Sequence, residues 1–188
     1  MDAAGGRYVE GAVMTSIPPY RIRVPLLLGG PFAAELLPQL QKLGFAPQFC
    51  HAQLGVASAT KMCRSVMIKG LEALVIESYT TARHHGVEDA MIATLQETFP
   101  SIDWHKQGSY FFSRVAQHGK RRAEEMREVA QTVREAGFEP FMASAIAQKH
   151  NWMAGQARAG HFAGLGKNPS WQAYADGLLA GRAAANDD

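Results

Sequence analysis

Short apolar runs bounded by glycine and proline fill the first fifty residues. Residues 7–14 and 23–30 each hold such a run, which is typical of buried strands in an α/β sheet. The segment between them carries two consecutive prolines, so we expect a loop there. Residues 31–44 begin with proline and end with glycine, as helices often do, and residues 45–50 predict one more strand.

From residue 55 onward the pattern becomes helical. Residues 55–81 predict one long helix whose apolar side chains recur three and four positions apart. This stripe consists of Ala59, Met62, Cys63, Val66, Met67, Gly70, Leu71 and Leu74. Further helices are predicted at residues 87–99, 120–137, 138–156 and 168–183.

These patterns predict a mainly α protein with two parts. Residues 54–188 are expected to form an all-helical C-terminal domain built around the long helix. Residues 1–53 supply only a few strands and one helix, whereas a sheet of this kind normally needs more parallel strands to cover both faces. We therefore expect them to be the last strands and helix of a larger, incomplete α/β sheet.

Composition excludes several classes of protein. The 188 residues are 47% hydrophobic, enough to bury a core, and the net charge of +2 argues against a large nucleic-acid-binding face. No apolar run is long enough to span a membrane, and the N-terminus has no secretion signal, so we expect a cytoplasmic protein without a membrane partner. Cys50 and Cys63 lack metal-ligand spacing and are expected to be small buried residues.

One lysine near the start of the long helix lies off the apolar stripe. Lys61 and Ser65 are four residues apart and share a second face, with Arg64 beside them, so an ammonium, a hydroxyl and a guanidinium point to the same region. That arrangement is consistent with a site. The alternative is that Lys61, Arg64, Lys69 and Glu72 form the solvated side of an amphipathic helix.

Several motifs together resemble a known family. AVM before a proline-containing loop, PLLLGG, a helix ending in LG, and G-x-x-x-x-x-K-M at the head of a long helix resemble the β-hydroxyacid dehydrogenases. That group includes 3-hydroxyisobutyrate and 6-phosphogluconate dehydrogenases. More specifically, GVASATKMCRSVMIKGLEAL and SRVAQHGKRRAEEMREVAQTV resemble the helical C-terminal domain of NAD-binding phosphogluconate dehydrogenase-like proteins. The resemblance extends over residues 7–156.

The resemblance implies a function as well as a fold. In such enzymes a Rossmann-type domain binds NAD or NADP, and a lysine near the start of the long helix is the general acid or base for the substrate hydroxyl. Lys61 falls on that lysine. The resemblance thus implies the C-terminal portion of an NAD(P)-dependent oxidoreductase that acts on a small hydroxy acid or a related polar substrate. It also implies a homodimer, with residues 1–53 as the remnant of the dinucleotide-binding domain.

The sequence departs from the family pattern at several places. The asparagine four residues after the lysine is replaced by Ser65, and the Ser-Gly-Gly turn that binds substrate is replaced by a stiffer segment with Thr15 and Ser16. The dinucleotide fingerprint G-x-G-x-x-G occurs nowhere in the sequence. We therefore expect no activity from this chain alone, and the alternative function is a non-catalytic helical dimerisation module.

A basic cluster in the second part is another candidate site. Arg114, His118 and Arg122 repeat every four residues and could bind a phosphate or a carboxylate of the substrate. Glu124 and Glu125 follow at once, so a solvated, salt-bridged helix face is the alternative. The histidines have no ligand spacing, and we expect no metal site.

Overall fold

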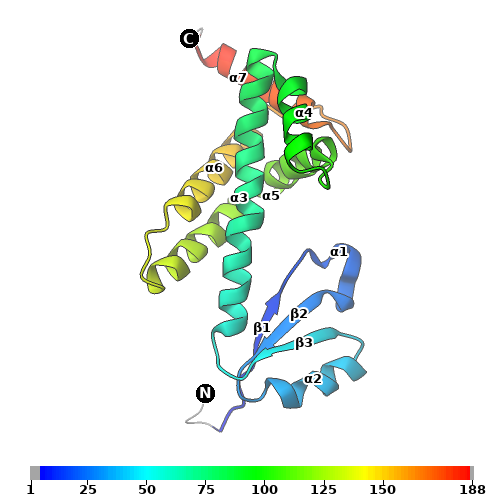
Figure 1. The fold of residues 1–188 in the computed structure, drawn as a ribbon, viewed down its shortest axis with the longest axis vertical. Helices are drawn as coiled ribbons and strands as arrows, with labels where there is room; N and C mark the ends of the chain where they lie inside the picture. Colours follow the sequence, from blue (N-terminus) through cyan, green and yellow to red (C-terminus); the bar gives the residue numbers. More distant parts are fainter. Residues whose placement is uncertain (1–4, 187–188) are drawn as a thin grey trace. The chain divides into compact units, whose positions relative to one another are not determined.

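The computed structural model of the protein describes residues 5–186 (Figure 1). The chain divides into two compact units, Met1–Ser65 and Val66–Asp188. The boundary between the two units falls inside helix α3 (Val56–His85), so each unit contains part of this helix. Each unit is described separately below.

The first unit is built on a small mixed sheet. Strands β1 (Glu10–Val13), β2 (Pro25–Gly29) and β3 (Ala46–His51) lie in the order β1-β2-β3. β1 runs antiparallel to β2, whereas β2 and β3 are parallel and are connected by helix α2 (Ala33–Lys42), which packs on both. The predicted strands and helix are confirmed.

The segment between β1 and β2 is more ordered than the predicted loop. It forms a short helix, α1 (Ile17–Tyr20), followed by a 3-10 helix, η2 (Arg21–Arg23). Pro18 has a non-helical backbone inside α1 (φ −71°, ψ 132°), so the segment is kinked at the prolines. The prolines therefore interrupt regular helix as predicted, although short helical turns occupy part of the expected loop.

The second unit is helical, and the prediction of a mainly α fold is confirmed. Besides the rest of α3, the described part of this unit contains four helices: α4 (Glu88–Thr98), α5 (Trp104–Glu135), α6 (Phe141–Arg158) and α7 (Trp171–Asn186). Figure 1 shows that α5 and α6 pack side by side and form a helical hairpin. Their core with α3 and α7 includes Ile76, Tyr79, Phe112, Val115, Met153 and Trp171, all nearly or fully inaccessible to solvent.

Helix α5 begins sixteen residues before the predicted start, at Trp104 rather than residue 120. The Asp103 side chain caps it by accepting a hydrogen bond from the Lys106 N–H at 3.0 Å. Two glycines inside the helix argue against helix in the sequence, but close packing requires them. A Cβ on Gly108 would lie 2.7 Å from the Tyr79 ring, and one on Gly119 would lie 2.7 Å from the His150 carbonyl oxygen.

The buried face of α3 is not the predicted apolar stripe. Met67 and Leu74 are 66% and 56% exposed, whereas Lys69 and Glu72 are 8% and 1% exposed. The alternative interpretation, in which Lys69 and Glu72 lie on the solvated side, is therefore wrong for these two residues. The expected burial of the cysteines is also wrong, because Cys63 is exposed and Cys50 is half-buried. Within the described part of the chain, no helix is long and apolar enough to cross a lipid bilayer.

Candidate functional site

A buried carboxylate holds the start of α3. Glu10 of β1 is 9% exposed, and its Oε1 accepts hydrogen bonds from the backbone N–H groups of Ala57 and Ser58 at 2.7 and 3.1 Å. Its Oε2 accepts from the Gly55 N–H at 2.8 Å. These are N–H groups that a helix start leaves without intrahelical partners, and negative charge is favourable at that end of a helix.

Lys61 lies on the second turn of this anchored helix. Its side chain is exposed, as is that of Arg64, whereas Ser65 is 7% exposed. Lys61 and Ser65 therefore share a helix face as predicted, but their surroundings differ. The desolvation that would tune a catalytic lysine has to come from groups that cover Lys61, such as bound substrate or a further domain.

The two residues expected to bind substrate on the strand side follow β1 directly. Thr15 is exposed, and Ser16 is the half-buried N-cap residue of α1, with an extended backbone (φ −64°, ψ 135°). The Met14 N–H just before them donates to the Pro25 carbonyl at 2.9 Å, which keeps this end of β1 attached to β2. Thr15, Ser16, Lys61 and Ser65 all belong to the first unit.

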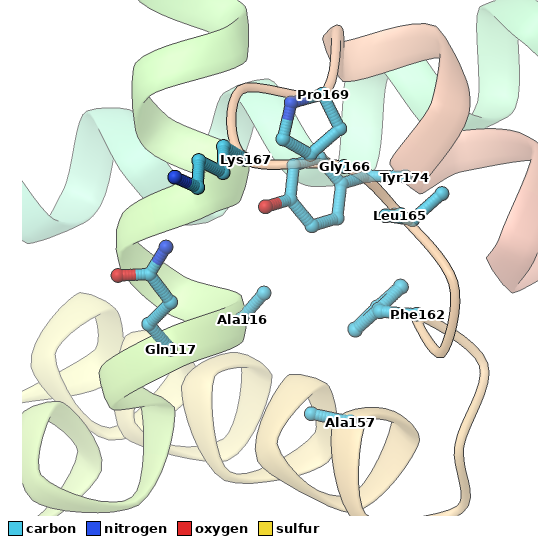
Figure 2. Close-up of a pocket in the computed structure, with 9 residues that line it drawn as sticks. All are labelled: Ala116, Gln117, Ala157, Phe162, Leu165, Gly166, Lys167, Pro169 and Tyr174. Carbon is cyan, nitrogen blue, oxygen red and sulfur yellow. The ribbon is translucent and has the colours of Figure 1, made fainter.

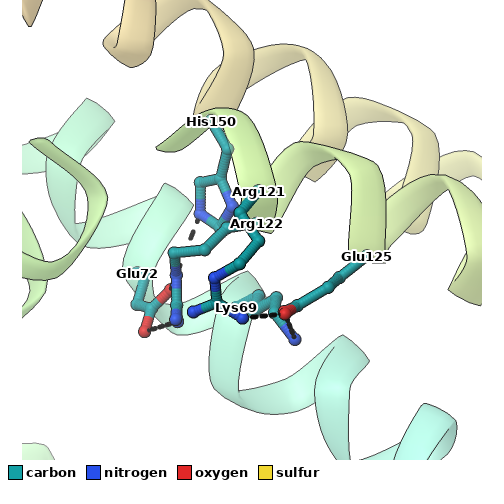
Figure 3. A network of polar contacts seen from close by, with 6 residues as sticks. All are labelled: Lys69, Glu72, Arg121, Arg122, Glu125 and His150. Atoms are coloured by element: carbon teal, nitrogen blue, oxygen red, sulfur yellow. Dashed lines mark hydrogen bonds and ion pairs between the residues drawn. The ribbon is translucent and has the colours of Figure 1, made fainter. Parts of the chain in front are cut away.

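One member of the predicted basic cluster, Arg122, belongs to a buried ionic network in the second unit (Figure 3). Arg122 is 6% exposed, and its guanidinium forms a bidentate pair with the Glu72 carboxylate: Nε donates to Oε2 at 2.9 Å and Nη2 donates to Oε1. Burial raises the pKa of the Glu72 carboxyl, and the Arg122 charge opposes that shift. Arg122 is therefore engaged within the fold, and its predicted role in substrate binding stays a prediction.

The network extends toward the surface through Glu125. The Lys69 ammonium lies 3.0 Å from Glu125 Oε2, and Arg121 pairs with the other carboxylate oxygen. Burial lowers the pKa of Lys69, although the contact with Glu125 opposes that shift. The cluster thus places a lysine and two arginines around the carboxylates of Glu72 and Glu125.

A fully buried histidine closes the inner end of the network. His150 Nε2 lies 3.7 Å from Glu72 Oε2, too far for a hydrogen bond, and neither ring nitrogen has a hydrogen-bond partner among the described residues. Burial, with smaller contributions from the charges of Arg122 and Lys69, lowers the pKa of His150 to about 3. His150 is therefore a neutral imidazole at pH 7.

The other members of the predicted cluster are less deeply placed. Arg114 and His118 are half-buried on α5. Burial and the positive charges of Arg114, Arg121 and Arg122 lower the pKa of His118. A neutral imidazole beside arginine charges can donate a hydrogen bond to an anionic ligand without adding to the repulsion among the cations.

A pocket of about 230 Å³ opens elsewhere in the second unit (Figure 2). Phe162, Leu165 and Tyr174 form apolar walls, and the side chains of Gln117 and Lys167 lie at its edge. None of the residues predicted to form the site lines it. Lys167 belongs to the segment GHFAGLGKN, which lacks the first glycine and the final Ser or Thr of a phosphate-binding loop.

Sequence reasoning missed Glu10, Lys69, Glu72 and His150. For Glu10 a signal exists, since a glutamate inside a short apolar strand must find a partner when it is buried. For the network no local signal exists, because Lys69 and Glu72 have the spacing of an ordinary solvated helix face. Their partners lie on α5 and α6, about fifty residues or more away.

Comparison with known proteins identifies relatives of both units. Residues 82–153 match a domain of unknown function, DUF1932. A conserved hypothetical protein from Sinorhizobium meliloti 1021 has a crystal structure that matches with a TM-score of 0.79 at 38% identity, covering 92% of this chain and 56% of that one.

Two further relatives are more distant. Conserved protein MTH1747, of unknown function, is described as structurally similar to 3-hydroxyacid dehydrogenases. It matches with a TM-score of 0.69 at 28% identity, over 80% of this chain and 57% of that one. An uncharacterized 28.5 kDa protein in the 7S RNA 5′ region of Methanothermus fervidus is 30% identical over 114 residues, 58% of this chain and 43% of that protein.

The chain spans about half the length of these relatives. The matched part includes the mixed sheet and the long helices, so the likeness is not confined to the helical unit. The matched domain and the structural similarity to a protein described as similar to 3-hydroxyacid dehydrogenases support the resemblance to the β-hydroxyacid dehydrogenase superfamily.

Proposed function

We propose that this chain is the C-terminal portion of an NAD(P)-dependent oxidoreductase that acts on a small hydroxy acid or a related polar substrate. The observation that carries the proposal is the anchored start of α3: an exposed Lys61 stands on the second turn of a helix whose first turn is bound to β1 by Glu10. The dehydrogenase-like fold supports it.

The sequence contains no G-x-G-x-x-G, so the residues of this chain do not supply the pyrophosphate cradle of a dinucleotide site. We infer that NAD or NADP, the hydride carrier, binds mainly to a domain outside the chain. The chain's own contribution is to hold the substrate through Thr15, Ser16 and Ser65. The Lys61 amine exchanges the proton of the reacting hydroxyl.

Arg114 and His118 are candidates for a second binding role. A guanidinium and a neutral imidazole together suit a carboxylate or phosphate group, because both donate hydrogen bonds and only one carries charge. Arg64 is a third candidate, since it is exposed on the same helix as Lys61.

The test uses a protein that carries this chain together with its dinucleotide-binding domain. Lys61→Met should lower kcat about 10²- to 10⁴-fold, the usual contribution of general acid–base catalysis. Lys120→Met changes an exposed lysine of α5 in the same way and should leave kcat within a few-fold of wild type. Equal turnover in wild type and Lys61→Met would remove Lys61 from the mechanism.

A homodimer is proposed as well, and two pairs of exposed apolar side chains favour it. Met67 and Leu74 lie seven residues apart on one face of α3, and both are more than half exposed. The second unit also exposes Phe138, which lies between α5 and α6, and Phe141, the first residue of α6, at 71% and 76%. Apolar side chains so exposed on a small unit are typical of a surface covered by a partner.

The same surface would serve the alternative function, a non-catalytic dimerisation module. Sedimentation should give a dimer for the wild-type chain and a monomer for the double variant Met67→Glu, Leu74→Glu. Lys120→Glu, at an exposed position of α5, should stay dimeric. A wild-type chain that sediments as a monomer at high micromolar concentration would argue against both the homodimer and the module.

A further inference from the structure

The side chain that anchors α3 reaches it across a glycine. Glu10 of β1 is the cross-strand neighbour of Gly29 of β2. A Cβ on Gly29 would lie 2.6 Å from Glu10 Oε1 and 2.9 Å from its Cγ. Any side chain at position 29 would therefore occupy the space through which Glu10 passes.

The start of α3 has no local side chain to cap it. The two residues before Val56 are Leu54 and Gly55, and neither carries a side-chain acceptor, whereas most helices use Ser, Thr, Asp or Asn at that place. Glu10 supplies the acceptor from a strand 45 residues earlier. Both of its oxygens are used, by three backbone N–H groups and, at 3.4 Å, by the Ser58 hydroxyl.

We propose that Glu10 is a positioning residue for Lys61. Its carboxylate joins the two segments that bear the proposed first-unit site, because β1 leads to Thr15 and Ser16, and the first turn of α3 leads to Lys61 within three residues of Ser58. Holding the amides of that turn against β1 fixes where the Lys61 amine stands relative to the strand end. The inference rests on the proposed function of Lys61.

The anchor requires a carboxylate, which makes a conservative test possible. A glutamine has nearly the same shape, but it replaces one acceptor oxygen with an NH₂ donor. In Glu10→Gln that donor would face backbone N–H groups, so at least one of the hydrogen bonds at Gly55, Ala57 or Ser58 is lost. Glu35→Gln is the matched control, since Glu35 is an exposed carboxylate of the same unit that pairs with exposed Arg7.

The first measurement is amide hydrogen exchange of this chain by NMR. In Glu10→Gln, exchange at Ala57 and Ser58 should accelerate about 10-fold, as expected for loss of a cap. Amides of α5 and all amides of Glu35→Gln should exchange as in wild type. Unchanged exchange at Ala57 and Ser58 would overturn the inference.

The second measurement is steady-state turnover in the protein that includes the dinucleotide-binding domain. Glu10→Gln should lower kcat about 10-fold or more with KM within about three-fold, because small misplacements of a catalytic group cost rate rather than binding. If exchange accelerates but kcat stays at the wild-type value, Glu10 only caps the helix and the inference fails.

Two controls separate this failure from others. Lys61→Met is assayed alongside: an unchanged kcat in that variant sinks the proposed function, whereas a reduced kcat there with normal turnover in Glu10→Gln sinks only the positioning role. Should Glu10→Gln fail to fold, Gly29→Ala keeps the carboxylate and displaces it. Gly29→Ala should show the same faster exchange and lower kcat, and wild-type values for both would overturn the inference.

Discussion

Lys61 and Lys69 stand eight residues apart on the same helix, yet their surroundings are opposite. Lys61 is exposed, whereas Lys69 is 8% exposed and lies 3.0 Å from Glu125. Both fall outside the apolar stripe of α3, so their spacing in the sequence does not distinguish them. The difference comes from α5 and α6, which cover the middle of α3 with charged and polar side chains.

This difference separates polar residues of α3 that are buried in ion pairs within the fold from those whose side chains are accessible to a ligand. Around Lys69 and Glu72 every carboxylate is bound to at least one cation, as Figure 3 shows. Buried charges need such partners because desolvation is costly. Around Lys61 the anchoring carboxylate binds the backbone rather than the lysine, which leaves the amine exposed.

Replacing Arg122 should have the largest effect on the buried ion pairs around Lys69 and Glu72. Arg122→Met leaves the Glu72 carboxylate buried without its bidentate partner, and we expect the free energy of unfolding to fall by about 3–5 kcal/mol. Urea unfolding followed by circular dichroism measures it. Arg121→Met, whose side chain is 58% exposed, should cost less than about 1 kcal/mol. The double variant Glu72→Leu, Arg122→Met should recover most of the loss, and equal instability in both would show that packing rather than charge is responsible.

Acid should weaken the same region through His150. Its pKa is about 3 in the folded protein and 6.5 when the side chain is exposed. Between pH 3 and pH 6.5 the imidazole is therefore protonated in the unfolded chain but neutral in the folded protein. Stability should therefore fall as pH drops below about 6.5, by up to about 1.4 kcal/mol per pH unit for this group.

The measurement compares urea midpoints of wild type and His150→Leu between pH 7 and pH 4. The groups facing the imidazole are Lys69, Glu72 and Arg122, and they remain in the variant. We expect His150→Leu to have a shallower loss of stability with acid, whereas His105→Leu, at an exposed position, should keep the wild-type slope. Parallel slopes for wild type and His150→Leu would show that acid acts elsewhere.

Most helices and strands were predictable because their ends carry local signals. Gly44 and Gly137 follow α2 and α5 with positive φ angles of 88° and 85°, a conformation that glycine adopts readily. The start of α5 was missed because Gly108 and Gly119 look like helix breakers. These glycines are required by tertiary packing, because they let α5 approach Tyr79 and the His150 carbonyl.

The candidate site was predictable where it lies on consecutive turns of one helix, and at Thr15 and Ser16, which the resemblance indicated. The spacing of Lys61 and Ser65 indicated a shared face, and the structure agrees. Glu10 was not predictable as an anchor, because the amides that it binds are 45 or more residues away. The burial of Lys69 and Glu72 was missed for the same reason: their partners are distant in sequence and leave no periodic trace.

Removing Lys69 should have a smaller effect than removing Arg122, and a different sign is expected. Burial lowers the pKa of Lys69, which means that the folded protein disfavours its charge, and Glu125 keeps Arg121 as a partner. Lys69→Met should therefore be as stable as wild type, or more stable by up to about 1 kcal/mol, at pH 7.

The pH dependence sharpens this prediction. A lysine whose folded pKa lies below 10.5 releases its proton first in the folded state, so wild-type stability rises as pH approaches 10.5. The advantage of Lys69→Met should shrink between pH 7 and pH 10 in urea unfolding. If Lys69→Met is instead destabilised by several kcal/mol at pH 7, the prediction is wrong. The Lys69–Glu125 pair would then stabilise the fold, as the Arg122–Glu72 pair is expected to do.

Lys61→Met should have the smallest effect on stability. Lys61 is exposed, and surface substitutions usually change the free energy of unfolding by less than about 0.5 kcal/mol. Urea midpoints of wild type and Lys61→Met should therefore coincide at pH 7. This result is what gives the turnover test its meaning, because a variant that folds as well as wild type and loses activity has lost chemistry. A destabilised Lys61→Met would place Lys61 with Lys69, as a residue that α3 needs for its structure.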